Sequence, residues 1–209
     1  MPQKEKKDSS VVVVGLPGSL RPGSHTRMAV DIALQGAREV GAITHLVDLS
    51  EYTLSFCDGR EDESTYPADV MKLRELVGQA HGIILGTPEY HGSFSGVLKN
   101  ALDLMGFDEF QGKMLGLIGV SGGALGATNA LSNLRMVGRA LHAWLVPEQA
   151  SIPEAWKVFD AAGNLKDEKL QQRLQEVGRQ VARFAYLHTS RAAQDFLKTW
   201  EGAPMNPGG

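Results

Sequence analysis

Strand-like segments alternate with segments of helical periodicity along the chain, and this alternation limits the possible folds more than any other feature. The first strand is predicted at residues 11–14, four valines in a row, which is typical of a strand buried on both faces of a parallel sheet. The pattern predicts an α/β protein with an open, mostly parallel sheet and helices on both faces. The expected strands are 11–14, 43–49, 81–85, 114–120 and 141–146, and the expected helices are 24–40, one from Pro67, 96–105, 124–138 and 167–188.

The composition is that of one globular domain in 209 residues. The 21 basic and 24 acidic residues give a net charge of −3, which argues against a nucleic-acid partner. Cys57 is the single cysteine, so an intramolecular disulfide and a multi-cysteine metal site are excluded, and we expect no metal. No apolar stretch has the length of a signal peptide or membrane span, so we expect a cytoplasmic protein without a membrane partner.

We expect the chain to have three parts. Residues 1–10 are polar and predict a disordered N-terminal arm, and residues 11–188 form the α/β domain. Residues 189–209 are predicted to be a partly disordered C-terminal extension that begins with a short helical piece. This extension either docks onto a neighbouring subunit or has no role.

The loop after the first expected strand has the composition of a phosphate site. Ligands of doubly wound sheets bind beyond the carboxyl ends of the strands. Loop 15–26 is rich in glycine, which lets backbone N–H groups approach an anion, and it leads into a helix whose dipole favours negative charge. It has neither the Walker A nor the Gly-x-Gly-x-x-Gly pattern. Its candidate phosphate ligands are Ser19, Arg21, Ser24 and Thr26, unless Ser24 only caps the helix of an ordinary loop.

Two more polar, glycine-rich loops, 86–96 and 121–126, follow the third and fourth expected strands. Exposed main-chain amides with few aliphatic side chains suit the polar rim of a flat heterocycle, and Tyr90 is available to cover part of its face. The three loops together predict a site for a flat ligand whose phosphate lies at loop 15–26.

These motifs, in this order, resemble the NADPH-dependent FMN reductase family over roughly residues 11–188. The resemblance rests on Gly18-Ser19-Leu20-Arg21 with Ser24 and Thr26, on Pro88-Glu89-Tyr90-His91-Gly92-Ser93 leading into Gly96-Val97-Leu98-Lys99-Asn100-Ala101-Leu102-Asp103, and on Ser121-Gly122-Gly123. The chain departs from the family pattern at four positions. Thr26 and His91 stand where many members have Asn, Ser95 where Pro is frequent and Leu104 where Trp is frequent.

The resemblance implies a flavodoxin-like three-layer sandwich, with a five-stranded parallel sheet of order 2-1-3-4-5 and helices on both faces. It implies bound FMN, and homodimers or homotetramers in which a neighbouring chain completes the flavin site. Whether His91 contacts the flavin stays open. The phosphate would be held by Ser19, Arg21, Ser24 and Thr26, and the isoalloxazine by Pro88, Glu89, Tyr90 and His91 with Ser121, Gly122 and Gly123.

The implied function is that of an NAD(P)H-dependent FMN reductase or quinone reductase. NADPH or NADH would deliver a hydride to FMN, and the electrons would pass to a quinone, chromate, an azo dye, a ferric chelate or free flavin. No catalytic side chain is required, because the flavin carries the chemistry. The alternative is a flavodoxin-like electron carrier without NAD(P)H activity, although such carriers tend to be strongly acidic and this chain has a charge of only −3.

A second alternative is a serine esterase. Gly119-Val120-Ser121-Gly122-Gly123 matches the Gly-x-Ser-x-Gly nucleophile elbow, between a predicted strand and a predicted helix. Asp160 and His188 follow Ser121 in the order of such a triad. This interpretation leaves loop 15–26 unexplained.

The remaining reactive or aromatic residues are expected to be structural. Asp58 and Glu61 lie near Cys57 and argue against a catalytic thiol, and the acidic run 58–63 indicates a solvated loop. Lys99 and Asp103 are spaced as an exposed helical ion pair. Trp144 and Trp156 are expected in the core or at an interface.

Overall fold

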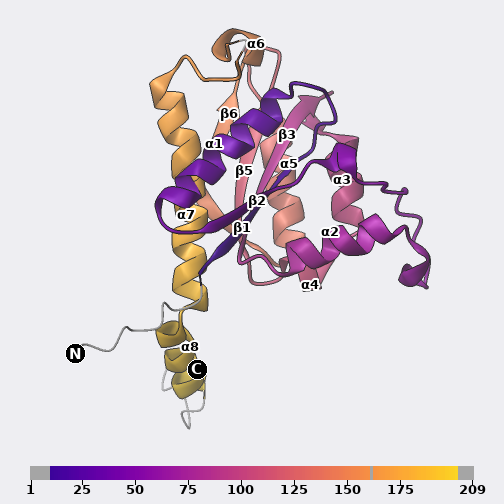
Figure 1. Ribbon diagram of the computed structural model, residues 1–209, viewed down its shortest axis with the longest axis vertical. Helices are drawn as coiled ribbons and strands as arrows, with labels where there is room; N and C mark the ends of the chain where they lie inside the picture. The colour runs from indigo at the N-terminus through magenta and orange to yellow at the C-terminus, as the bar shows by residue number, and fades with distance from the viewer. Residues whose placement is uncertain (1–9, 161, 202–209) are drawn as a thin grey trace.

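Five parallel strands form the centre of the molecule. The computed structural model describes residues 10–160 and 162–201. The five strands lie side by side in the order β2-β1-β3-β5-β6 (Figure 1), so the predicted flavodoxin-like sheet order is confirmed. A short strand that the sequence pattern did not predict, β4 (Ser93–Phe94), pairs antiparallel with the end of β3. The parallel strands are β1 (Val12–Pro17), β2 (Ile43–Leu46), β3 (Gly82–Tyr90), β5 (Met114–Val120) and β6 (Trp144–Ile152).

Helices cover both faces of the sheet, as predicted. The side chain of Val13 packs with one helical layer and that of Val14 with the other, because successive residues of a strand point to opposite faces. Ile84 and Ile83 of β3 divide between the two layers in the same way. One layer contains α1 (His25–Glu39) and α7 (Glu168–Thr189), and the other contains α2 (Ala68–Gly78), α3 (Gly96–Asp103) and α5 (Thr128–Ala140).

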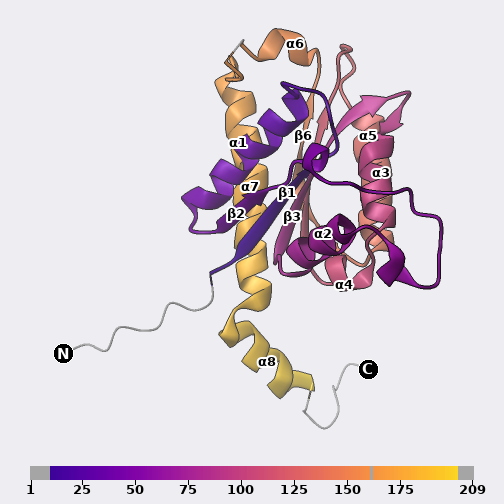
Figure 2. The same ribbon diagram turned by 45° about the vertical axis from the view of Figure 1, so that its right-hand side comes forward.

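The remaining helical elements are short or peripheral. Helix α8 (Arg191–Glu201) follows α7 and extends away from the sheet in both views (Figures 1 and 2). Residues 1–9 and 202–209, where a disordered arm and tail are predicted, lie outside the described residues. Among the described residues, no helix has the length and apolar character needed to cross a bilayer. The single turns are α4 (Phe107–Phe110) and α6 (Ala155–Val158), and the 3₁₀ turns are Leu49–Glu51 and Glu63–Thr65.

Two glycines allow α1 and α7 to pack closely. A Cβ atom on Gly178 of α7 would overlap the carbonyl oxygen of Ala33, and one on Gly36 of α1 would overlap the carbonyl oxygen of Gln175. Glycine is therefore required at both positions, although it lowers helix propensity by roughly 1 kcal/mol relative to alanine.

Strands β3 and β6 both continue beyond their predicted ends. β3 continues to Pro88 because it pairs with β5 as far as Val120, and on to Tyr90 because it pairs with β4. β6 begins and ends later than predicted, at Trp144 and Ile152 instead of residues 141 and 146. In the structure Pro147 lies on an edge strand, where the register with β5 shifts, and both settings tolerate a proline.

Candidate functional site

Four loops meet at the carboxyl edge of the sheet and enclose a pocket of about 260 Å³. They follow β1, β3, β5 and β6. All of the predicted site residues line this pocket except His91 and Gly123. The loop after β6 was not predicted to contribute, and it adds Ala155 and Trp156.

The end of the pocket at α1 has the features of an anion site. Ser24 caps α1, and its hydroxyl oxygen accepts a hydrogen bond from the backbone N–H of Arg27 at 3.3 Å. Capping uses only an acceptor lone pair, so the hydroxyl proton of Ser24 is still available to a ligand. The first turn of α1 contains no acidic residue, and the buried Thr26 lies in it. The positive end of the helix dipole therefore faces the pocket without a competing carboxylate.

Arg21 adds a positive charge to this end of the pocket. Within the described part of the chain its guanidinium makes no hydrogen bond or ion pair, so it is available to a ligand. The neighbouring imidazole of His25 stacks on Phe159, with ring centroids 4.9 Å apart and planes 4° apart. Burial and the charge of Arg21 lower the pKa of His25, so its ring is neutral at pH 7.

The loops after β1 and β3 are held together at the base of the pocket. The backbone N–H of Gly18 donates to the carbonyl oxygen of Gly86 at 2.8 Å. The hydroxyl of the buried Ser95 donates to the carbonyl oxygen of Gly18 at 2.6 Å and accepts from the N–H of Leu98 at 3.1 Å, which caps α3. Ser95, one of the departures from the family pattern, thus joins the loop after β1, the loop after β3 and the start of α3.

His91 forms a hairpin turn and lies outside the pocket. β3 and β4 pair through Tyr90 and Ser93, so His91 and Gly92 are the two turn residues between them. Both have positive φ, 52° and 76°, as a type I′ turn requires. Asn is the favoured residue at the first of these positions, which gives a conformational reason for the Asn that many family members carry there.

Glu89 has a structural contact that the sequence did not reveal. One of its carboxylate oxygens accepts a hydrogen bond from the backbone N–H of Ala130 at 2.9 Å. Ala130 lies in the first turn of α5, whose N-cap residue Ala127 has no side-chain acceptor. The carboxylate also complements the positive end of the α5 dipole, so Glu89 joins the pocket loop to that helix.

The loops after β5 and β6 are joined by main-chain hydrogen bonds. The N–H of Ser121 donates to the carbonyl oxygen of Ile152 at 2.8 Å, and the N–H of Ala155 donates to the carbonyl oxygen of Ser121 at 3.0 Å. Gly122 belongs to the loop after β5, and an added Cβ there would meet no atom within 4 Å. The space above Gly122 is therefore open to a ligand.

The two tryptophans predicted for the core or an interface are exposed in the chain. The relative exposure is 61% for Trp144 and 63% for Trp156, so the core assignment is wrong for both. Trp144 begins β6 at the amino edge of the sheet, whereas Trp156 lines the pocket at the carboxyl edge. The predicted strand ended at residue 146, so the sequence did not place Trp156 at the carboxyl edge.

The geometry does not support an esterase triad. The ring of His188 lies 6.0 Å from that of Trp144, at the amino end of β6. Ser121 follows β5 at the opposite edge of the sheet, and its hydroxyl oxygen accepts from the N–H of Gly123 at 3.0 Å. The carboxylate of Asp160 accepts hydrogen bonds from Ala162 and Asn164 of its own loop.

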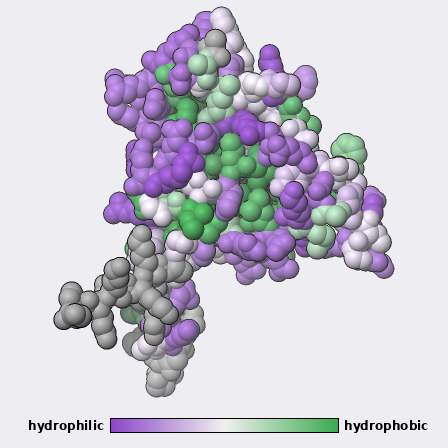
Figure 3. Space-filling model, in the orientation of Figure 1, coloured by the Kyte–Doolittle hydropathy of each residue, from purple (hydrophilic) through white to green (hydrophobic). Residues whose placement is uncertain are grey.

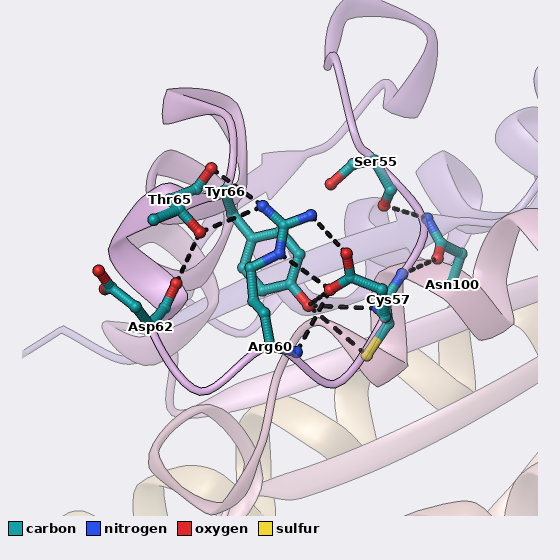
Figure 4. Close-up of polar contacts among 8 residues, drawn as sticks. Ser55, Cys57, Arg60, Asp62, Thr65, Tyr66 and Asn100 are labelled. Carbon is teal, nitrogen blue, oxygen red and sulfur yellow. Dashed lines mark hydrogen bonds and ion pairs between the residues drawn. The ribbon is translucent and has the colours of Figure 1, made fainter.

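The acidic run 58–63 is largely exposed, as predicted for a solvated loop, and polar contacts hold it in place. Figure 4 shows Arg60 stacked against Tyr66, and its guanidinium carbon lies 4.2 Å from the ring centroid. Arg60 also pairs with Asp58 at 2.6 Å, which holds the pKa of that carboxyl well below its usual range. The N–H of Cys57 donates to the side-chain oxygen of Asn100 at 3.0 Å. Cys57 does not line the pocket.

Other candidate groups stay apart from the pocket. Lys99 and Asp103 form the exposed helical ion pair expected from their spacing, at 2.5 Å. In residues 10–160 and 162–201 no cluster of His, Cys, Asp and Glu has the arrangement of a metal site.

A second cavity, of about 630 Å³, lies near the amino edge of the sheet between the end of α1 and α7. None of the glycine-rich loops contributes to its lining.

Comparisons with known proteins agree with this geometry. Residues 11–157 match a family model described as NADPH-dependent FMN reductase. The chain is 34% identical over 182 residues to the NADPH-dependent FMN reductase ArsH of Shigella flexneri, which covers 85% of this chain and 69% of that protein. It is 35% identical over 161 residues to the FMN-dependent NADPH-azoreductase of Staphylococcus saprophyticus, covering 75% of this chain and 85% of that protein.

A solved structure shares both fold and sequence with the chain. It is FerB, a flavoenzyme NAD(P)H:(acceptor) oxidoreductase from Paracoccus denitrificans. The TM-score is 0.64 at 25% sequence identity, and the match covers 85% of this chain and 98% of FerB.

Proposed function

The chain belongs to the NADPH-dependent FMN reductase family, and we propose that the pocket between its four loops is the FMN site of an FMN-dependent NAD(P)H oxidoreductase. One observation carries the assignment of the pocket. At one end lie the guanidinium of Arg21, which has no partner in the described residues, and the amino end of α1, which has no acidic residue in its first turn. At the other end, the space above Gly122 is open. This polarity matches a molecule with a phosphate at one end and a flat ring at the other.

The phosphate end of FMN fits the loop after β1. Arg21 supplies a charge-assisted hydrogen-bond donor, and the amino end of α1 supplies dipole and backbone N–H groups. Ser19, Ser24 and Thr26 supply hydroxyl groups from the same segment. The neutral ring of His25 stacks on Phe159, and this contact fixes the start of α1 against the loop after β6.

The isoalloxazine fits the loops after β3 and β5. Pro88 and Tyr90 present flat surfaces, while Ser121 and Gly122 present main-chain groups suited to the polar edge of the ring. A side chain at Gly122 would fill the space that the ring needs. Glu89 acts here by fixing its loop to α5.

The protein contributes binding and orientation to the reaction. When bound, FMN would supply the redox chemistry, namely hydride acceptance from NADPH and electron transfer to a second substrate. Arg21 and the amino end of α1 would fix the phosphate end of the cofactor. The hydrogen-bonded loops 121–123 and 152–156 would fix the position of its ring. Fixing both ends orients the ring for transfer, and no side chain has to gain or lose a proton.

The electron acceptor in this proposal is a small molecule that takes the place of the nicotinamide in the same pocket. Quinones, azo dyes, chromate, ferric chelates and free flavin all satisfy this description. The azoreductase and NAD(P)H:(acceptor) oxidoreductase names of the relatives support a small organic acceptor.

The proposal includes a cytoplasmic homodimer or homotetramer. Exposed large apolar side chains support self-association, among them Phe56 at 84%, Leu125 at 95% and Met136 at 71% relative exposure. Hydrophobic surface also gathers in the middle of the face drawn in Figure 3, with hydrophilic residues around it. A neighbouring copy would cover part of this surface.

Steady-state turnover distinguishes this function from electron carriage. The FMN-loaded protein is expected to oxidise NADPH continuously when a small quinone is present. A carrier that depends on protein partners would bind FMN and leave NADPH unchanged, and that result would overturn the proposed activity while leaving the cofactor in place.

A further inference from the structure

Strand β6 has one exposed tryptophan near each end. Trp144 is its first residue, and Trp156 follows its last residue, Ile152, by four positions. Their side chains are almost equally exposed, 61% and 63%, but only Trp156 lines the pocket of about 260 Å³. The nine residues of β6 separate the two edges of the sheet by roughly 25 Å, so the pair differs mainly in location.

Several contacts hold Trp156 in place although its ring is exposed. The indole N–H donates to the carbonyl oxygen of Gly122 at 3.4 Å, and the N–H of Glu154 donates to the carbonyl oxygen of Gly123 at 3.1 Å. Glu154 has a left-handed backbone, with φ of 42°, at the start of the turn that carries Trp156. Phe159, three residues beyond Trp156, stacks on His25. The segment is thus tied both to the loop after β5 and to α1.

A fixed and exposed indole at a pocket is suited to a flat ligand. A large aromatic surface in water gains free energy when another ring system covers it. Strained non-glycine backbone such as that of Glu154 occurs preferentially at ligand sites. The ring of Trp156 also lies 4.9 Å from the ammonium of Lys157, which is itself held by Glu154 at 2.5 Å.

These contacts place Trp156 beside the ring end of the proposed cofactor. Its indole N–H is already directed at Gly122, above which the isoalloxazine is proposed to lie. The cation beside its ring, Lys157, is engaged by the carboxylate of Glu154. A contact with the phosphate of FMN would need a hydrogen-bond donor or a cation without a partner, and this segment offers neither at Trp156. Trp156 therefore offers aromatic surface, which suits the ring of FMN.

We propose that Trp156 is a flavin-binding residue whose indole packs against the ring system of FMN. This proposal rests on the proposed FMN site. It adds the loop after the last strand of the sheet to the cofactor site and gives it the role of an aromatic wall.

The test compares two ligands and three variants by equilibrium titration of the flavin-free protein. The ligands are FMN and riboflavin, which share the ring and differ in the phosphate. Trp156→Ala is expected to weaken binding of both by about tenfold, and by the same factor, because a stacking contact to the ring is lost. Trp144→Ala is the matched control and is expected to bind both like the wild type. Trp156→Phe keeps an aromatic surface and is expected to recover most of the affinity.

Two outcomes of the titration would contradict the proposal. Unchanged affinity in Trp156→Ala, or a loss with FMN that is absent with riboflavin, would overturn the ring contact. Should Trp156→Ala fail to fold by circular dichroism, Trp156→Phe decides: an indole in contact quenches flavin fluorescence more than a phenyl ring, so bound flavin should be brighter in this variant, and equal brightness would overturn the proposal. A wild-type protein that binds neither flavin would instead defeat the proposed function itself.

Discussion

The hydroxyl of Ser95 donates a 2.6 Å hydrogen bond to the carbonyl oxygen of Gly18, a residue 77 positions earlier in the chain. This contact fixes the loop after β1 to the start of α3. Ser95 is buried, so its two partners, Gly18 and the N–H of Leu98, have no ready access to water. The hydroxyl of Ser95 thus holds the loop after β1 in place together with the hydrogen bond from the N–H of Gly18 to the carbonyl oxygen of Gly86.

Ser95→Ala is expected to lower the free energy of unfolding by about 2 kcal/mol, because it removes a helix cap and leaves a buried carbonyl oxygen unpaired. Urea unfolding of the flavin-free protein measures this change. Ser132→Ala is the control, since that exposed hydroxyl donates only to the carbonyl oxygen of Thr128 in its own helix. Equal midpoints for the two variants would contradict the role of Ser95.

Arg21→Ala is expected to weaken FMN binding by about 1.5–3 kcal/mol, the size of a lost hydrogen bond to a charged group. Isothermal titration of the flavin-free protein gives the value directly. Arg38→Ala serves as the control, because Arg38 lies at the other end of α1 and pairs with Asp31 at 3.2 Å. Unchanged FMN affinity in Arg21→Ala would remove this residue from the site.

Gly122→Val is expected to abolish FMN uptake without unfolding the protein. The added side chain meets no protein atom near its Cβ and projects into the space proposed for the ring. Circular dichroism reports the fold, and the yellow colour after incubation with FMN reports uptake. Gly78→Val, at the end of α2, also adds a side chain into open space and should remain yellow. A yellow, active Gly122→Val variant would show that the ring lies elsewhere.

His91→Asn is expected to raise the free energy of unfolding by about 0.5–1 kcal/mol, since Asn tolerates the left-handed backbone of a type I′ turn better than His. FMN affinity should not change, because His91 lies outside the pocket. Thermal unfolding and FMN titration of the same variant test both statements. Loss of FMN affinity would instead give His91 a contact with the cofactor.

Local sequence patterns were sufficient for the centre of the fold and for three of the four pocket loops. Val13 and Val14 follow the two-residue period of a buried strand, and the loops after β1, β3 and β5 carry their glycine and hydroxyl residues in one continuous stretch each. Such signals depend on neighbours in sequence, so they can be read without knowledge of the tertiary structure.

The features that were missed depend on tertiary contacts. Pro147 normally marks the end of a strand, and only the edge position and register shift of β6 let the strand continue to Ile152. With that end misplaced, Trp156 could not be assigned to the carboxyl edge. The contact between Glu89 and the N–H of Ala130 joins residues 41 positions apart and has no local pattern. The turn role of His91 depended on β4, a two-residue strand.

The central claim is that the pocket at the carboxyl edge of the sheet binds FMN, and the absorption spectrum of the purified protein during FMN titration tests it most directly. We predict saturable uptake of FMN with the visible bands of a protein-bound flavin, and loss of those bands when NADPH is added without oxygen. A wild-type protein that is folded, colourless and unable to take up FMN would contradict the account.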